Sequence, residues 1–243
     1  AVQEPSSHLA KQAFKEGLAK DGEFATFYAG GSGTGKTSAI KGIPEINGVI
    51  KDSSVVLDGN LSSYDSAMKK IAQADKAGKK TPIVYVYRDP VESFVQGVVK
   101  RMINNKEEMG RLVPSKVIAE NHIGSWEAVK RLYSEGHDVY FIDNSFGAGK
   151  AKRVSFADLN KKIKYPSQEK LTEMFNAEAE RLLKLGPDKG GITPEQYAGY
   201  VGKIKKELPS LGKQIEQVRQ GKQGLSVELS AGSSSPQLSK LGS

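Results

Sequence analysis

Eight glycine-rich residues that directly follow an apolar run limit the folds open to this chain more than any other feature. Residues 30–37 read Gly-Gly-Ser-Gly-Thr-Gly-Lys-Thr and fit the pattern G-x-x-x-x-G-K-[ST] at every fixed position. The run before them, 24–29, favours a strand, and the Lys-Thr-Ser-Ala-Ile-Lys that ends the motif and continues beyond it is compatible with a helix. A flexible Gly/Ser linker would lack such flanks. The motif therefore predicts a phosphate-binding loop between a strand and a helix.

In such a loop, glycines let successive backbone N–H groups point at phosphate oxygens, and the lysine adds a positive charge. A nucleoside triphosphate is the predicted ligand, with Mg²⁺ bound to the hydroxyl of Thr37. The residues predicted to bind the nucleotide are Gly30, Gly31, Ser32, Gly33, Thr34, Gly35, Lys36, Thr37 and Ser38.

Strand-like and helical segments alternate through the first part of the chain. After a short amphipathic helix at 6–20, strands are predicted at 24–29, 54–57, 82–87 and 138–142. Helices are predicted between and beside them, at 37–41, 63–77, 91–106 and 115–134. The alternation predicts an α/β fold of the P-loop NTPase type, with a mostly parallel sheet and helices on both faces. Ligands bind beyond the carboxyl ends of such strands. The polar residues expected at that edge are Asp58, Arg88, Asp89, Asp143 and Asn144, beside Gly30.

The pattern divides the chain into three parts. Residues 1–150 are the predicted P-loop core, and 151–220 are a predicted helical extension packed on or linked to it, with helices at 166–185, 194–207 and 212–219. Residues 221–243 are rich in Gly, Ser and Gln and are predicted to form a flexible tail.

Composition excludes several functions. The 243 residues include no cysteine, so disulfides, thiolate zinc sites and cysteine nucleophiles are excluded. No apolar run approaches the roughly 18 residues of a membrane span, so no membrane partner is expected. The net charge is +8, and residues 151–243 carry most of it, with 16 Lys and Arg against 10 Asp and Glu. The densest lysine clusters in that part, at 161–164 and 203–206, lack the interleaved aromatic side chains expected of a protein that binds single-stranded nucleic acid, which favours solvated helix faces over a nucleic-acid surface.

Asp58 ends the apolar run Val-Val-Leu-Asp, 22 residues beyond Lys36. A carboxylate there can face the γ-phosphate and accept the proton of an attacking hydroxyl, as a general base. A motor-type Walker B aspartate is the alternative, and Asp89 and Asp143 end similar runs. A helix cap is the structural alternative for each of the three. The base role is favoured for Asp58, because the further arginine and sensor elements of a motor are not found.

Two arginines follow in the segment 101–111. A planar guanidinium binds phosphate oxygens in pairs, so Arg101 and Arg111 are candidates for stabilising the transferred phosphoryl group. Each alone would be typical of a surface residue.

Together these features resemble the zeta toxins, the P-loop kinases of bacterial toxin–antitoxin systems. The resemblance covers about residues 22–145 and rests on the phosphate loop, Asp58, the helix with Arg101, and Gly110-Arg111-Leu-Val-Pro114 leading into Ile118-Ala-Glu-Asn-His122. Zeta toxins use ATP and magnesium to phosphorylate a sugar hydroxyl of UDP-N-acetylglucosamine. The resemblance implies a phosphotransferase with an alcohol acceptor, in which Lys36 and Thr37 hold phosphates and metal, Asp58 is the base, and Arg101 and Arg111 clamp the phosphate.

The chain departs from zeta toxins in its shorter arginine spacing, in Asn60 at a usually acidic position, and in the helical extension. The resemblance implies UDP-N-acetylglucosamine as the first candidate acceptor, and the departures leave another metabolite, such as a dinucleotide with a free ribose hydroxyl, as the alternative. A non-catalytic, ATP-gated module that binds a partner or nucleic acid is a hypothesis of another class. The resemblance also implies a protein antitoxin as partner, and a cytoplasmic location, in a target cell if the toxin is delivered.

Three smaller features complete the predictions. His8, His122 and His137 are too scattered for a metal site and are interpreted as surface or packing residues. Trp126 is predicted to pack in the core. The segment 147–150, Gly-Ala-Gly-Lys, mimics part of a phosphate loop but lacks its full spacing and is interpreted as an ordinary loop.

Overall fold

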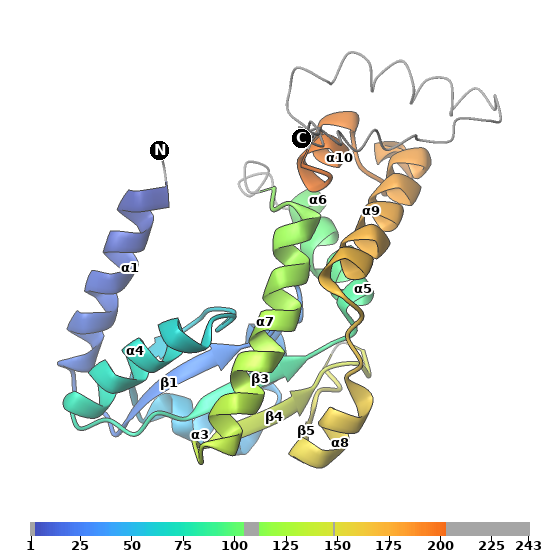
Figure 1. The fold of residues 1–243 in the computed structure, drawn as a ribbon. Helices are drawn as coiled ribbons and strands as arrows, with labels where there is room; N and C mark the ends of the chain where they lie inside the picture. Colours follow the sequence, from blue (N-terminus) through green and yellow to red (C-terminus); the bar gives the residue numbers. More distant parts are fainter. Residues whose placement is uncertain (1–2, 105–111, 148, 203–243) are drawn as a thin grey trace, which may run out of the picture.

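The computed structural model describes residues 3–104, 112–147 and 149–202, with side chains from residue 9 onward (Figure 1). Its centre is a five-stranded sheet of order β2-β1-β3-β4-β5. The strands are β1 (Phe24–Ala29), β2 (Ser53–Leu57), β3 (Ile83–Tyr87), β4 (Val139–Asp143) and β5 (Lys152–Val154). β1 to β4 are parallel, and β5 runs antiparallel along β4. The predicted α/β class is confirmed, with β5 as an additional edge strand.

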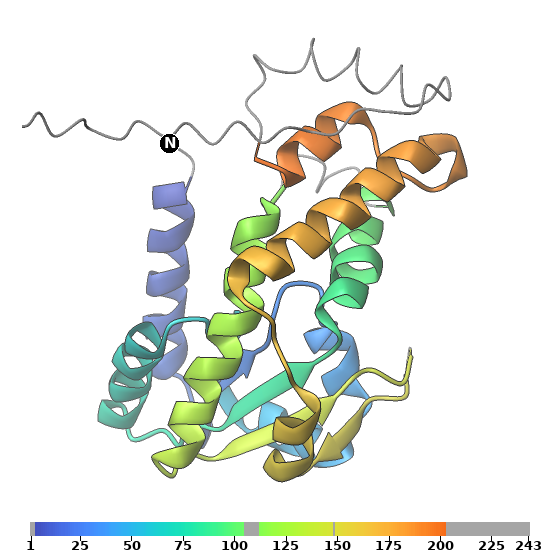
Figure 2. The same ribbon diagram turned by 45° about the vertical axis from the view of Figure 1, so that its right-hand side comes forward.

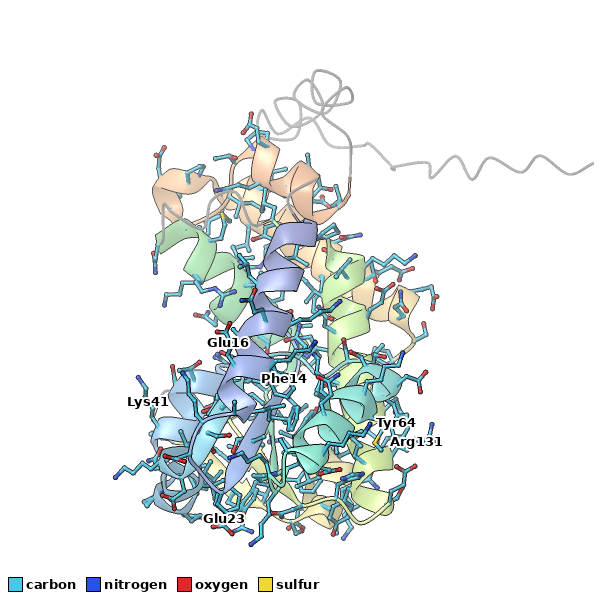
Figure 3. The ribbon with its side chains drawn as sticks, turned by 90° about the vertical axis from the view of Figure 1, so that its left-hand side faces the viewer. Phe14, Glu16, Glu23, Lys41, Tyr64 and Arg131 are labelled. Carbon is cyan, nitrogen blue, oxygen red and sulfur yellow. The ribbon has the colours of Figure 1, made fainter. Side chains whose placement is uncertain are left out.

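One face of the sheet is covered by α1 (Gln3–Leu18), α4 (Tyr64–Lys76), part of α7 (Ser115–Ser134) and α8 (Phe156–Lys162). Their apolar side chains meet the strands in one cluster, in which Phe14 of α1 lies 6.0 Å from Phe27 between ring centroids. Figure 3 views this side, with Phe14 on α1 and Tyr64 beside Arg131. The cluster includes Trp126, whose side chain is 3% exposed, so the core prediction for Trp126 is confirmed.

The other face is covered by α2 (Lys36–Lys41) and α3 (Pro44–Lys51). Ile40 and Ile46 from these helices pack on Val84 and Val86 of the central strand. The sequence analysis missed α3. Proline in its first turn has the backbone angle a helix needs and lacks only an N–H that would be unpaired there, so Pro44 begins a helix in a segment for which no helix was predicted.

A layer of helices stands over the carboxyl ends of the strands (Figure 2). It contains α5 (Pro90–Glu92), a π-helix (Ser93–Val99), α6 (Lys100–Asn104), the first half of α7, α9 (Gln168–Leu185), a 3₁₀ turn (Pro187–Lys189) and α10 (Pro194–Tyr200). Its core joins Phe94, Ile118, Phe175 and Tyr200, with Phe94 and Phe175 stacked at 5.1 Å. α7 runs through both the layer and the sheet cluster.

The helix predicted at 91–106 is thus three segments, with a π-helix at its centre. Its end, the predicted helices beyond residue 202 and the predicted tail at 221–243 lie outside the described residues. Among the helices that are described, none combines the length and apolar character needed to cross a membrane.

Candidate active site

The phosphate loop connects β1 to α2, which begins at Lys36. Gly30, Gly33 and Gly35 have φ angles of 130°, 80° and 77°, which side chains on L-residues disfavour. The turn from strand to helix therefore requires glycine at these positions. The strand, loop and helix expected from the motif are all present.

Lys36 folds back over the loop that precedes it. Its Nζ donates hydrogen bonds to the carbonyl oxygens of Gly30 and Gly31, at 3.1 and 3.3 Å, and to Oδ1 of Asn60 at 3.1 Å. Burial lowers the pKa of Lys36 to about 8, while the charge of Asp58 opposes this and that of Arg101 adds to it. Asn60, noted in the sequence only as a departure, thus fixes the lysine of the phosphate loop.

A cavity of about 870 Å³ opens over this loop. Six of the nine predicted nucleotide-binding residues line it: Ser32, Gly33, Gly35, Lys36, Thr37 and Ser38. Gly30, Gly31 and Thr34 are buried behind them, where the Thr34 hydroxyl donates to the Gly31 carbonyl at 3.0 Å.

The carboxyl ends of three parallel strands bring further residues to the same cavity. Asp58 follows β2, Arg88 follows β3 and Asn144 follows β4, and all three line it. Asn144 also donates from Nδ2 to the Thr34 carbonyl at 2.8 Å, which ties β4 to the phosphate loop. Asp58 does not cap α4, because Ser63 does so by accepting from the N–H of Ser66.

The other two aspartates expected at this edge have structural roles. Asp89 caps α5 by accepting from the N–H of Glu92 at 2.9 Å. Asp143 is 4% exposed, accepts from the N–H of Ser145 at 3.0 Å and forms an ion pair with Lys162. Neither residue is among those lining the cavity. The cap interpretation is therefore confirmed for Asp89. Among the described residues, Asp58 is the acidic residue that lines the cavity.

The two predicted arginines differ in outcome. Arg101, on α6, lines the cavity. Arg111 lies outside the described residues. Arg88 supplies a cation that the sequence analysis had placed only at the sheet edge, and it pairs with Glu92 one turn along. Lys36, Arg88 and Arg101 thus give the cavity a positive lining, which favours phosphate groups.

Part of the cavity lining is apolar. It consists of side chains from the helical layer and the segment before α7: Met102, Val113, Val117 and Tyr200. Tyr200 comes from α10, so the part of the chain predicted as an extension contributes to the cavity. Gly147 and Gly149, from the segment interpreted as an ordinary loop, also line it.

The phosphate loop rests on α7, through contacts that the sequence analysis did not find. Ser125 Oγ accepts from the N–H of Gly30 at 2.8 Å. Nε2 of His122 lies 3.0 Å from the carbonyl oxygen of Ser32, and Nδ2 of Asn121 donates to Ser32 Oγ at 3.4 Å. His122 is fully buried, so its interpretation as a packing residue is correct but incomplete.

Burial lowers the pKa of His122 from 6.5 to about 4, an effect that the Ser32 carbonyl opposes and Lys36 reinforces. In the unfolded chain His122 is therefore protonated below about pH 6.5, whereas in the folded protein it is protonated only below about pH 4. The contribution of neutral His122 to the free energy of unfolding is fully present above pH 6.5, and it is lost as the pH falls from 6.5 toward 4. We expect the free energy of unfolding to fall by about 2 kcal/mol from pH 7.5 to pH 5 because of His122. Urea unfolding at both pH values measures the loss, and His122→Gln should reduce it by this amount.

A second close contact involves the π-helix. A Cβ built on Gly97 would overlap the backbone of Gly33, and one built on Gly33 would overlap the carbonyl of Ser93. The π-helix and the phosphate loop therefore touch backbone to backbone. Single π turns occur often at functional sites, and this one brings Gly97 onto the loop.

The residues present fit a magnesium ion held largely by phosphate oxygens. Within the part of the chain that the structure describes, no three His, Cys, Asp or Glu side chains gather in a group suited to a metal. Thr37 and Asp58 offer hard oxygen atoms to the cavity, and Mg²⁺ typically takes few protein ligands beside phosphates and water.

Comparison with known proteins supports the resemblance noted in the sequence. Residues 48–146 match the family model of the zeta toxins, a match that begins after the phosphate loop and contains Asp58 and Arg101. The chain is thus similar to zeta toxins over this range. A search of curated proteins found no match.

Several solved structures are similar to this chain. The AvrRxo1-ORF1:AvrRxo1-ORF2 complex is 16% identical, over 85% of this chain and 87% of that chain, with a TM-score of 0.47. The same complex with ATP is 14% identical, over 86% and 88%, with a TM-score of 0.48. The PezAT toxin–antitoxin system of Streptococcus pneumoniae is 11% identical, over 76% and 98%, with a TM-score of 0.42.

Proposed function

We propose that this protein is an ATP-dependent kinase that transfers the γ-phosphate to a hydroxyl group of a small, nucleotide-linked metabolite. The observation that carries the proposal is the shared cavity: Asp58 faces the same space as Lys36 and Thr37 of the phosphate loop. Asp58 is exposed there and caps no helix that follows it. The match to the zeta toxin family model over residues 48–146 supports the same reaction.

The proposed roles follow from chemistry. Asp58 accepts the proton of the substrate hydroxyl as its oxygen attacks the γ-phosphorus, and the bond to the bridging oxygen of ADP breaks. Lys36, Arg101 and Arg88 stabilise the negative charge on the phosphoryl oxygens, and we assign Arg111 to the same task on the family resemblance alone. Magnesium, held with the help of Thr37, neutralises phosphate charge when it is bound.

We propose UDP-N-acetylglucosamine as the first candidate acceptor. The cavity is lined by apolar side chains, among them Met102, Val117 and Tyr200, as well as by Arg88 and Arg101, which suits a ligand with both a base or sugar and phosphate groups. A dinucleotide with a free ribose hydroxyl has the same chemistry and is the alternative. On the family match we also propose a protein antitoxin as partner.

Product analysis tests the proposal. The protein is incubated with ATP, Mg²⁺ and a panel that includes UDP-N-acetylglucosamine and NAD, and products are identified by mass spectrometry. We expect one acceptor to gain the mass of one phosphoryl group in step with ADP formation. Transfer to no member, with ATP bound, would contradict the kinase and favour an ATP-gated binding module.

A further inference from the structure

The conformation of the phosphate loop depends on hydrogen bonds from α7 as well as on its own glycines. The contacts described above join Ser125 to Gly30 and His122 to Ser32. These two residues of α7 lie almost one turn apart, so they present one side of the helix to the start of the loop. Gly30 and Ser32 both precede Lys36, and the loop is thus tied to α7 where it leaves β1.

We propose that His122, together with Ser125, is a positioning residue for nucleotide binding: the imidazole donates from Nε2 to the Ser32 carbonyl and holds the phosphate loop ready for ATP. This inference uses the ATP site of the proposed function and does not depend on any acceptor. It assigns a task to a residue that touches the loop from behind and is absent from the cavity lining.

The hydrogen bond fixes the chemical form of the ring. A carbonyl oxygen can only accept, so the proton lies on Nε2. Nδ1 then carries a lone pair, and it is buried with no hydrogen-bond partner among the described residues. An unpaired buried nitrogen costs stability. Packing alone would therefore favour an apolar ring at residue 122, and the donor to Ser32 is what histidine adds.

The imidazole is held from both sides. On one side, a Cβ at residue 31 would overlap the ring, so Gly31 leaves the space that His122 fills. On the other, the rings of Tyr165 and Phe175 lie 6.3 and 6.2 Å away between centroids. These neighbours and the hydrogen bond to Ser32 restrict the ring, so the Ser32 carbonyl is held in place without ATP. Such preorganisation lowers the ordering cost that binding must meet.

Two substitutions at residue 122 separate donation from packing. His122→Phe keeps a ring but removes the donor, and His122→Gln keeps an N–H donor at similar reach. Titration calorimetry with Mg·ATP at pH 7.5 should show binding about 10- to 100-fold weaker for Phe. Gln should stay within about threefold of wild type, because its amide replaces the donor. A role in packing alone predicts the reverse order, and tight binding by His122→Phe would overturn the proposal.

Ser125→Ala keeps the test open if His122→Phe does not fold, as thermal unfolding will show. It removes one of two acceptors for the Gly30 N–H, since the Asn60 carbonyl lies 3.2 Å away, so we expect a loss of about three- to tenfold. Ser115→Ala is the matched control, a buried serine of the same helix without a hydrogen-bond partner among the described residues. Equal affinities for both serine variants would contradict the proposal. Wild-type protein that binds Mg·ATP but phosphorylates nothing would contradict only the proposed function.

Discussion

Asp58→Asn is expected to reduce phosphoryl transfer by about 10²- to 10⁴-fold and to leave ATP binding close to wild type. Asparagine has the size of aspartate but cannot accept the proton of the attacking hydroxyl. Asp58 is exposed in the cavity, so its replacement leaves no buried group unpaired. Initial rates of ADP formation with the identified acceptor measure the loss, and calorimetry measures the affinity for Mg·ATP.

Asp89→Asn is the matched control for Asp58→Asn. Asp89 also follows a strand of the sheet, but its side chain caps α5, and asparagine caps a helix about as well as aspartate. We expect this control to keep its rate. If Asp58→Asn turned over normally, the base would have to be another group. If it lost ATP affinity instead, Asp58 would act like a Walker B aspartate, the alternative raised by its sequence.

Gly97→Ala is expected to give the second largest loss, although residue 97 carries no chemistry of its own. The added methyl group would overlap the backbone of Gly33, which cannot swing aside as a side chain can. The phosphate loop or the π-helix must therefore move. A displacement of about 1 Å at a reacting site costs about 10²-fold in rate. Overpacking also destabilises by about 1–3 kcal/mol. Transfer rates, Mg·ATP titration and urea unfolding measure the three effects.

Gly48→Ala provides the comparison for Gly97→Ala. Gly48 lies within α3, and a Cβ there meets no atom within 4 Å. Alanine in a helix is about 1 kcal/mol more favourable than glycine, so this variant should be as stable as wild type or more so, with full activity. Unchanged Mg·ATP affinity in Gly97→Ala would show that the π-helix does not fix the loop.

Much of the architecture was predictable because it depends on local patterns. Parallel strands buried on both faces are short apolar runs, and the four between 24 and 143 were all found. β5 was missed, because three residues that include Lys152 and Arg153 show neither an apolar run nor alternation. The π-helix was missed for another reason. A π turn contains one more residue than an α-helical turn, and this difference is too small to be recognised in the spacing of apolar residues along the segment.

The site was predictable only where a motif carries it. The phosphate loop and Asp58 were found from spacing, and both line one cavity. His122 lies 90 residues from its partner Ser32, and a histidine on a helix gives no sign of such a contact. In the sequence, Asn60 is only an asparagine at a usually acidic position, whereas in the structure its Oδ1 accepts a hydrogen bond from Nζ of Lys36 at 3.1 Å. Contacts of this kind depend on how the chain returns to the loop, which local sequence patterns do not contain.

The passage of α7 through both clusters has a thermodynamic consequence. Trp126 and Leu132 of this helix belong to the cluster on the sheet, and Ile118 belongs to the cluster of the helical layer. A helix forms cooperatively, so order lost at one end of α7 is transmitted to the other. We therefore infer that the sheet and the helical layer melt together as one cooperative unit. The packing energy of Phe175 and Tyr200, which lie far along the chain from residues 30–37, is thereby part of what keeps the phosphate loop folded.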